Sequence, residues 1–277
     1  MKAYPHLFAK LFCQPLMLHG PTRLSFESVL MERMSGDVMP NAKIGNGSTS
    51  ERVKSIYEQI GNVAIVTIDG AIDKRVSSMD MECYGGVDLC DVDSALALAL
   101  HSSAEKIVLD IHSPGGSVVG VHETYSRILA LCEAKEVHAY INAMACSAGY
   151  YLAAACDHIA AAPTATVGSI GVYLAIIDQS RRLDAAGVTV NVMQGGTWKT
   201  AGADYKPLAD AERAMMQAKV DSLYANFKSA VNARRPQVED ATMQGQWMQA
   251  EEGLTTGLVD ELTTATLDEY VASLLMQ

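Results

Sequence analysis

The stretch Ala145-Cys146-Ser147-Ala148-Gly149-Tyr150-Tyr151-Leu152-Ala153-Ala154-Ala155-Cys156 sets one serine among small residues. The apolar run at 137–141 predicts a short strand before it, and the alanine-rich run after it predicts a tightly packed, buried helix. Ser147 is therefore expected at a helix N-terminus, where free backbone N–H groups and the positive end of the helix dipole stabilise an oxyanion. Serine is also a preferred helix cap, so this stretch alone leaves two interpretations open: a cap and a nucleophile.

Apolar runs alternate with helix-like runs through the middle of the chain. The runs 63–68 and 107–111 are continuously apolar, as in strands buried on both faces, and each precedes a run with helical spacing. Further strands are expected at 170–177 and 188–193. The run 209–235, with an apolar residue every three or four positions, predicts a long amphipathic helix that contacts the core or another subunit. This alternation predicts an α/β fold.

The two ends of the chain differ from its middle. Residues 1–34 mix apolar and basic positions and are expected to form short amphipathic helices, whereas 35–50 hold turn-forming residues typical of a linker. We therefore expect an N-terminal arm and linker over 1–50 and one domain over 51–277. Removal of residues 1–50 by self-cleavage is a hypothesis, because exposed polar linkers are preferred sites of proteolysis.

Composition excludes several classes of protein. The chain of 277 residues is 49% hydrophobic with a net charge of −11, which predicts a sizeable core and neither nucleic acid nor a membrane surface as partner. The N-terminus lacks a signal peptide, so an intracellular protein is expected. No metal-ligand spacing links the cysteines, which are expected to be free thiols. They are Cys13, Cys83, Cys90, Cys132, Cys146 and Cys156.

Two glycine-containing stretches carry candidate functional groups. Ser113-Pro114-Gly115-Gly116-Ser117 is expected to be a turn between a strand and a helix, and its glycines leave backbone N–H groups open to an anion or a carbonyl oxygen. Thr166-Val167-Gly168-Ser169-Ile170-Gly171-Val172 places Ser169 in a turn that enters a strand. Each stretch taken alone also has a plain interpretation as a turn, which turn statistics favour for Ser113 to Ser117.

A third stretch, Gly195-Gly196-Thr197-Trp198-Lys199-Thr200-Ala201-Gly202, places one lysine in a loop of mostly small residues. Most loop lysines are solvated, but a neutral lysine can accept the proton of a nucleophilic serine. Gly115 or Gly116, together with Ala148, could donate N–H groups to the oxyanion. Ser147 and Lys199 would then complete a Ser–Lys hydrolase. His112 is the rival base, but a Ser–His–Asp set would leave the loop around Lys199 unexplained.

These stretches, in this order and at these separations, resemble the signal peptide peptidase A family of serine peptidases over residues 60–262. The resemblance rests on Ser113 to Gly116, Cys146 to Gly149, Gly168 to Gly171, and Lys199, and it includes Gly257-Leu258-Val259-Asp260. His112 departs from the pattern, because family members usually have asparagine there. The N-terminal Pro5 to Phe12 and Gln14 to Leu18 resemble the tailed-phage branch of the family, the capsid-assembly proteases.

The resemblance implies a crotonase-like (ClpP-like) fold with Ser147 as nucleophile and Lys199 as general base. Ser169 would hold Lys199, while Gly115 or Gly116 and the Ala148 N–H would form the oxyanion hole. It implies no metal or nucleotide cofactor, and it implies a homo-oligomeric ring in which the lysine can reach a neighbouring subunit's serine. Expected substrates are scaffold, portal or capsid proteins in a phage prohead within the host cytoplasm. Two alternatives stay open: a cellular peptidase of the same family, and a non-catalytic assembly protein.

Overall fold

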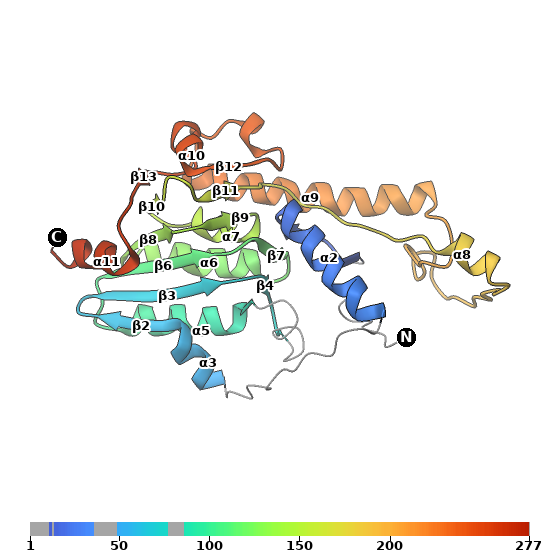
Figure 1. The fold of residues 1–277 in the computed structure, drawn as a ribbon, viewed down its shortest axis with the longest axis horizontal. Coiled ribbons are helices and arrows are strands. Elements are labelled where there is room, and N and C mark those ends of the chain that lie inside the picture. Colours follow the sequence, from blue (N-terminus) through green and yellow to red (C-terminus); the bar gives the residue numbers. More distant parts are fainter. Residues whose placement is uncertain (1–10, 13, 36–48, 77–85, 277) are drawn as a thin grey trace.

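A six-stranded sheet forms the centre of the molecule (Figure 1). The computed structural model describes residues 11–12, 14–35, 49–76 and 86–276, so most of the linker expected at 35–50 lies outside the described residues. The strand order is β13 (Glu261–Leu262), β10 (His158–Ala161), β8 (Glu136–Ile141), β6 (Lys106–His112), β3 (Val63–Asp69) and β2 (Tyr57–Ile60). Neighbouring strands are parallel except for β2 and β3. The chain is thus a mixed α/β structure rich in parallel pairing.

Helices surround this central sheet (Figure 1). The helices are α2 (Gly20–Ser35), α3 (Thr49–Ile56), α5 (Leu89–His101), α6 (Val121–Cys132), α7 (Ala148–Ala153), α8 (Ser180–Ala185), α9 (Asp210–Arg234), the 3-10 turn η1 (Asp240–Met243), α10 (Ala250–Thr256) and α11 (Leu267–Leu275). In the part of the chain that the structure describes, no helix is long and apolar enough to cross a membrane.

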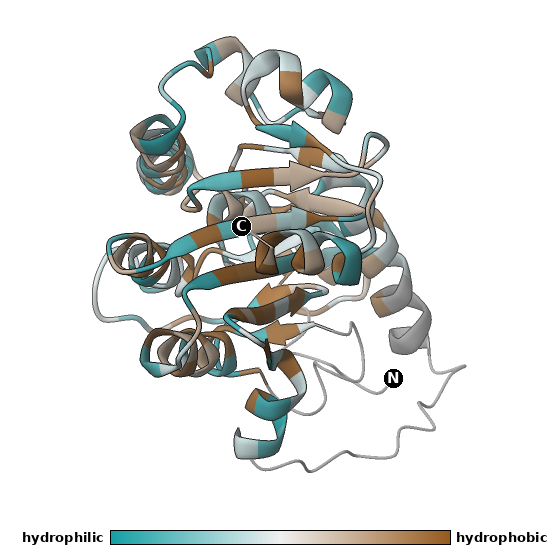
Figure 2. Cartoon of the chain, turned by 90° about the vertical axis from the view of Figure 1, so that its left-hand side faces the viewer, coloured by the Kyte–Doolittle hydropathy of each residue, from teal (hydrophilic) through white to brown (hydrophobic). Residues whose placement is uncertain are grey.

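Both faces of the central sheet are covered, which explains why β3 is apolar along most of its length. Ala64, Val66 and Ile68 belong to the main core with α5, α6 and α7, whereas Val63 and Ile65 pack with residues of α11. Successive side chains of a strand point to opposite faces, so a strand covered on both faces shows no polar alternation. Figure 2 shows these apolar strands at the centre of the molecule with helices beside them.

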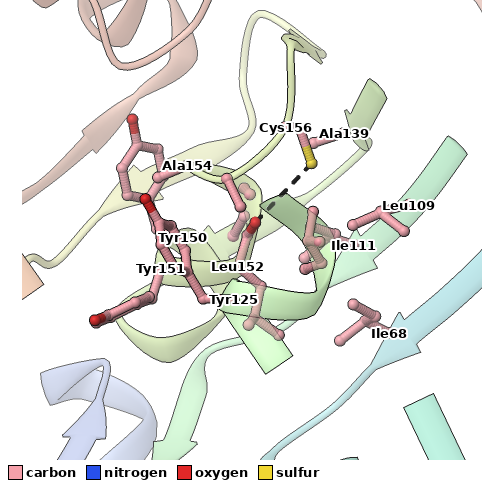
Figure 3. Close-up of a cluster of buried hydrophobic side chains, with 14 of the residues drawn as sticks. Ile68, Leu109, Ile111, Tyr125, Ala139, Tyr150, Tyr151, Leu152, Ala154 and Cys156 are labelled. Atoms are coloured by element: carbon pink, nitrogen blue, oxygen red, sulfur yellow. Dashed lines mark hydrogen bonds between the residues drawn. The ribbon is translucent and has the colours of Figure 1, made fainter. Parts of the chain in front are cut away.

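Helix α7 lies inside the main core. All six of its residues are buried, and Figure 3 shows Leu152 on the side of Ile111, with Tyr150 and Tyr151 on the opposite side. Small residues let it approach its neighbours: a Cβ on Gly149 would lie 3.0 Å from the Ser113 Cβ. The prediction of a tightly packed helix after Ser147 is confirmed.

The buried Tyr150 hydroxyl ties α7 to the C-terminal part of the chain by donating to the Leu258 carbonyl at 2.8 Å. We expect Tyr150→Phe to lower the free energy of unfolding by about 1–2 kcal/mol, because the buried carbonyl loses its donor. Urea denaturation measures this change. Tyr57→Phe is the matched control: its half-buried hydroxyl makes only a 3.4 Å contact with Gln59, so its effect should stay within about 0.5 kcal/mol. Equal effects of both variants would contradict the prediction.

Two smaller sheets lie beside the central one and contain the stretches singled out in the sequence. The first has the order β1 (Leu16–Leu18), β7 (Gly115–Ser117), β4 (Ile72–Asp73) and β5 (Val87–Asp88). The second has the order β12 (Trp247–Gln249), β11 (Thr166–Gly168) and β9 (Met144–Cys146). The stretch Ser113 to Ser117 is thus not only a turn: its last three residues form a strand because β1 and β4 bind its two edges.

Residues 174–209, which we call the arm, extend away from the sheets and carry α8 at their far end (Figure 1). The strands predicted at 170–177 and 188–193 are absent there, and only Tyr173 pairs, with Leu16. Val188, Val190 and Val192 have the alternation of a strand but are 44–48% exposed. A strand needs the backbone of a neighbour, and the described part of this one chain offers none to 188–193.

Helix α9 confirms the helix predicted at 209–235. Phe227 and Ala230 are buried, whereas Met216, Val220 and Leu223 are half-buried. The apolar stripe is therefore fully covered only towards the C-terminal end of the helix, where Phe227 stacks on Tyr151 with ring centroids 4.6 Å apart.

Candidate active site

Ser147 lies at a sharp junction between strand β9 and helix α7. Its φ of 54° and ψ of −118° are rare for a residue with a side chain, and such backbone conformations cost on the order of 1–3 kcal/mol. The Ser147 N–H donates to Gly168 at 2.8 Å, while its carbonyl accepts from the Tyr151 N–H at 2.8 Å and so begins the helix. Ser147 is thus the N-cap residue of α7 by position, but its side chain makes no cap hydrogen bond, so capping does not account for the hydroxyl.

Ser169 occupies the equivalent place on the neighbouring strand. Gly168 pairs with Cys146 in the parallel β11–β9 ladder, so the two serines follow paired residues. Ser169 also has a positive φ of 55° and is buried. Its N–H donates to the Gln246 carbonyl at 2.7 Å. The sequence predicted that Ser169 lies in a turn that enters a strand. In the structure Ser169 instead follows a strand, because β11 ends at Gly168.

Gly115 lies directly against the Ser147 junction. A Cβ built on Gly115, whose φ is 96°, would lie 2.9 Å from the Ala148 nitrogen and 2.9 Å from the Ser147 Cβ. The Ala148 N–H is at the first position of α7 and has no acceptor within the helix. The Gly115 N–H donates to the Ser113 hydroxyl at 3.2 Å. Gly115 therefore supplies clearance, and the Gly116 N–H, which faces its ladder partner Met17 on strand β1, is the other glycine donor beside Ser147.

We expect Gly115→Ala to slow phosphonylation of the Ser147 hydroxyl by at least about a hundredfold, because a methyl group would displace the Ala148 N–H or the serine from its place. The rate of labelling by a fluorophosphonate probe measures this loss. Gly187→Ala is the matched control: Gly187 also has a positive φ, of 68°, but nothing lies within 4 Å of its Cβ position. Equal labelling rates in the two variants would remove Gly115 from the site.

Lys199 does not join this group within one chain. It is exposed on the arm, in the loop that follows α8. Gly202, three residues after Lys199, packs on Met216 of α9. Met216 lies about 16 Å along this helix from Phe227, which stacks on Tyr151 of α7. Lys199 is thus anchored near the end of α9 that is distant from α7. A base must come within about 3 Å of the serine oxygen. The structure brings together Ser147, Ala148, Ser169, Gly115 and Gly116, but not Lys199.

His112 points away from the serines. Its Nδ1 lies 3.0 Å from the Asp69 carboxylate, and both side chains are mostly exposed, whereas Ser147 is buried. An exposed pair of this kind contributes little to stability. Strand alternation explains the separation, because Ser113, the next residue, turns its hydroxyl inward to the Gly70 carbonyl at 2.6 Å.

The surroundings of Ser147 favour a hydroxyl nucleophile over a thiolate. Burial raises the pKa of the adjacent Cys146 thiol to about 12, so this thiol stays protonated near neutral pH. The cysteines among the described residues, Cys90, Cys132, Cys146 and Cys156, are free. No group of three or more His, Cys, Asp or Glu side chains in the described ranges is placed to hold a metal ion.

Sequence reasoning assigned no role to Ser113 or Gln246, although both position the site. The Ser113 hydroxyl accepts from the Gly115 N–H, and the Gln246 carbonyl holds Ser169. The motif containing Ser113 was a usable signal. Gln246 acts through its backbone, which no side-chain pattern reveals.

The chain is similar in sequence to known proteins over much of its length. The model of peptidase family S49 matches residues 130–275. The chain is 27% identical to capsid assembly protease C of Escherichia phage lambda, over 96% of this chain and 64% of the relative. It is also 27% identical to head-tail preconnector protein GP5 of Enterobacteria phage P21, over 94% of this chain and 55% of the relative. A putative protease of Synechocystis is 33% identical over 61% of this chain.

The chain thus spans about 55–64% of the length of the two phage relatives. The family match covers the junction at Ser147, the end of β11 at Ser169, and the arm with Lys199. From this match, the chain belongs to peptidase family S49.

Proposed function

We propose that the chain is a serine endopeptidase in which Ser147 is the nucleophile. The observation that carries this proposal is the strained Ser147 junction, with the free Ala148 N–H and the glycines of β7 packed against it. Backbone strain of this kind persists where the surroundings hold it in place for function. The Ala148 and Gly116 N–H groups would bind the oxyanion, and Gly115 would leave room for the substrate.

Lys199 is the proposed base, supplied by a neighbouring subunit. Three observations support this: Lys199 is exposed, the arm has unpaired strand-like residues, and Trp198 and Met193 beside it are 50% and 92% exposed. An arm docked on a second copy of the chain would cover these apolar side chains. The proposed assembly is a homo-oligomeric ring, because a head-to-tail contact repeats until it closes.

A pocket beside Ser169 offers a place for the incoming lysine. It has a volume of about 420 Å³, and its lining includes Ser169, Tyr173, Tyr224 and Gln244. Desolvation in such a pocket favours a neutral amine, which is the form that accepts a proton. The Ser169 hydroxyl would then hold the amine by a hydrogen bond.

The proposed reaction has two stages. The Ser147 oxygen forms a bond to the substrate carbonyl carbon while its proton passes to the Lys199 amine. As the peptide C–N bond breaks, this proton passes to the leaving nitrogen, and the acyl group remains as an ester on Ser147. Water then attacks the ester carbonyl carbon and gives one proton to the Lys199 amine. The amine passes this proton to the Ser147 oxygen as the ester C–O bond breaks, which frees the serine and releases the product as a carboxylic acid that ionises in water.

The substrates follow from the relatives. Because one relative is named a capsid assembly protease and another a head-tail preconnector protein, we propose phage scaffold, portal or capsid proteins as substrates within a prohead. The proposal includes a crotonase-like fold for the peptidase domain at 51–277, preceded by an N-terminal extension and linker at 1–50. No cofactor takes part in the proposed reaction.

Covalent labelling tests the proposed nucleophile. The full-length oligomer is treated with a fluorophosphonate probe, digested and mapped by mass spectrometry. The expected result is a single labelled peptide carrying the probe on Ser147, with no label in Ser147→Ala. Cleavage of an unstructured protein without any labelling of Ser147 would overturn the assignment.

A further inference from the structure

Strand β1 has hydrogen-bonding neighbours on both of its edges. On one edge it pairs antiparallel with β7, from Leu16 opposite Ser117 to Leu18 opposite Gly115. On the other edge the Leu16 N–H donates to Tyr173 at 2.9 Å and its carbonyl accepts from Tyr173 at 3.0 Å. Without β1, the edge of β7 would be open, and an open strand edge is a template for an extended peptide.

The register places Met17 against the proposed oxyanion hole. The Leu16 backbone faces Tyr173 and the His19 N–H donates to the Pro114 carbonyl at 2.8 Å. The alternation of an antiparallel ladder therefore turns the Met17 carbonyl towards its partner Gly116. The Cβ position of Gly115 lies 2.2 Å from this carbonyl oxygen, and the same position lies 2.9 Å from both the Ala148 nitrogen and the Ser147 Cβ.

The side chains of β1 divide between two apolar clusters. Met17 is 3% exposed and belongs to the main core. Leu16 and Leu18 belong instead to a separate cluster with Leu11, Phe12 and Leu30. Met17 thus fills an apolar site beside the serine, as the residue on the acyl side of a cleaved bond would do.

We propose that β1 lies in the substrate channel as a substrate-like strand, with Met17 in the position of the residue whose carbonyl is attacked. Protein substrates compete with β1 for the edge of β7, and they present an unbranched apolar residue to the site that Met17 fills. This inference rests on the proposed function, because it takes Ser147 as the nucleophile.

Hydrogen exchange on the full-length chain tests this occupancy without using catalysis. In the Ser147→Ala background, we expect Met17→Asp to expose the Gly116 amide, the one in β7 that faces β1, to exchange, since a buried carboxylate would force β1 out. A synthetic peptide of residues 14–20 should restore the protection of this amide, and the same peptide with aspartate in place of Met17 should not. Unchanged protection of β7 in Met17→Asp, or failure of the peptide to restore it, would overturn the proposal.

Labelling of Ser147 in the active chain gives a second measurement. Release of β1 should speed fluorophosphonate labelling about tenfold, because the fraction of chains with an open site rises. Leu24→Asp is the matched control, since Leu24 in α2 is 62% exposed and its variant should label at the wild-type rate. If Met17→Asp does not fold, Leu16→Pro replaces it, because proline removes the N–H that binds Tyr173.

The two measurements separate the two proposals. If Ser147 is not labelled in any chain while the peptide protects β7, the proposed function is contradicted, but the assignment of the β7 edge as a peptide-binding channel is supported. If Ser147 is labelled at the same rate in Met17→Asp and the wild type, and the peptide does not protect β7, the proposed function stands and the channel assignment fails.

Discussion

Ser147→Ala is expected to abolish cleavage of an unstructured protein substrate, with a loss of at least about 10⁴-fold in kcat/KM. The reason is that the methyl group cannot form the acyl ester, while folding should be unaffected because the serine side chain makes no cap hydrogen bond. Cleavage assays on chains of matched oligomeric state measure the loss.

His112→Ala is the control for this experiment. His112 contacts Asp69 at the exposed end of the sheet, so its variant should cleave at the wild-type rate. Loss of activity in His112→Ala together with normal activity in a Lys199→Ala chain would show that histidine is the base and would contradict the proposed Ser–Lys pair.

Lys199→Ala is expected to be as inactive as Ser147→Ala, but the two variants should restore activity when they are produced together. If each site takes its serine from one subunit and its lysine from the next, random mixing leaves about one quarter of the sites complete. The physical reason is that Lys199 belongs to the arm, and the arm extends away from the sheets (Figure 1). Cleavage by the co-purified mixture, compared with each variant alone, measures the recovery.

A double variant that carries both substitutions in one chain, mixed with Ser147→Ala, is the control. This mixture contains no intact Ser147 and should stay inactive. If Ser147→Ala and Lys199→Ala mix into one oligomer and recover no activity, the lysine serves its own subunit and the arm must fold back onto the body.

Local sequence was sufficient to predict those helices and strands whose pattern of burial is the same along their whole length. The run 63–68 is buried on both faces, so its continuous apolar character identified the strand directly. Helix α9 shows the spacing of an amphipathic helix, and its bounds fell within one residue of the prediction. The junction at Ser147 was also predictable, because small residues after an apolar strand permit a buried helix.

Local sequence failed where an element depends on a partner distant in the chain. The glycines of Ser113 to Ser117 have no strand propensity, yet Gly115 to Ser117 are a strand because β1 and β4 provide backbone partners. The run 188–193 has strand alternation, yet it forms no strand where no partner is present. Hydrogen bonding between strands is a property of the pair, so one strand's sequence cannot decide it.

By itself, the sequence determined the α/β class, the position of Ser147 at the start of a buried helix, and the small residues that allow close approach to it. Only the tertiary structure decided that Ser169 follows the strand paired with that of Ser147, that Gly115 and Gly116 differ in their contacts, and that the Met17 carbonyl lies near Ser147. It also decided that Lys199 lies outside the site of its own chain. These relations join residues far apart in the chain, and the pairing of strands and the packing of the core bring such residues together or keep them apart.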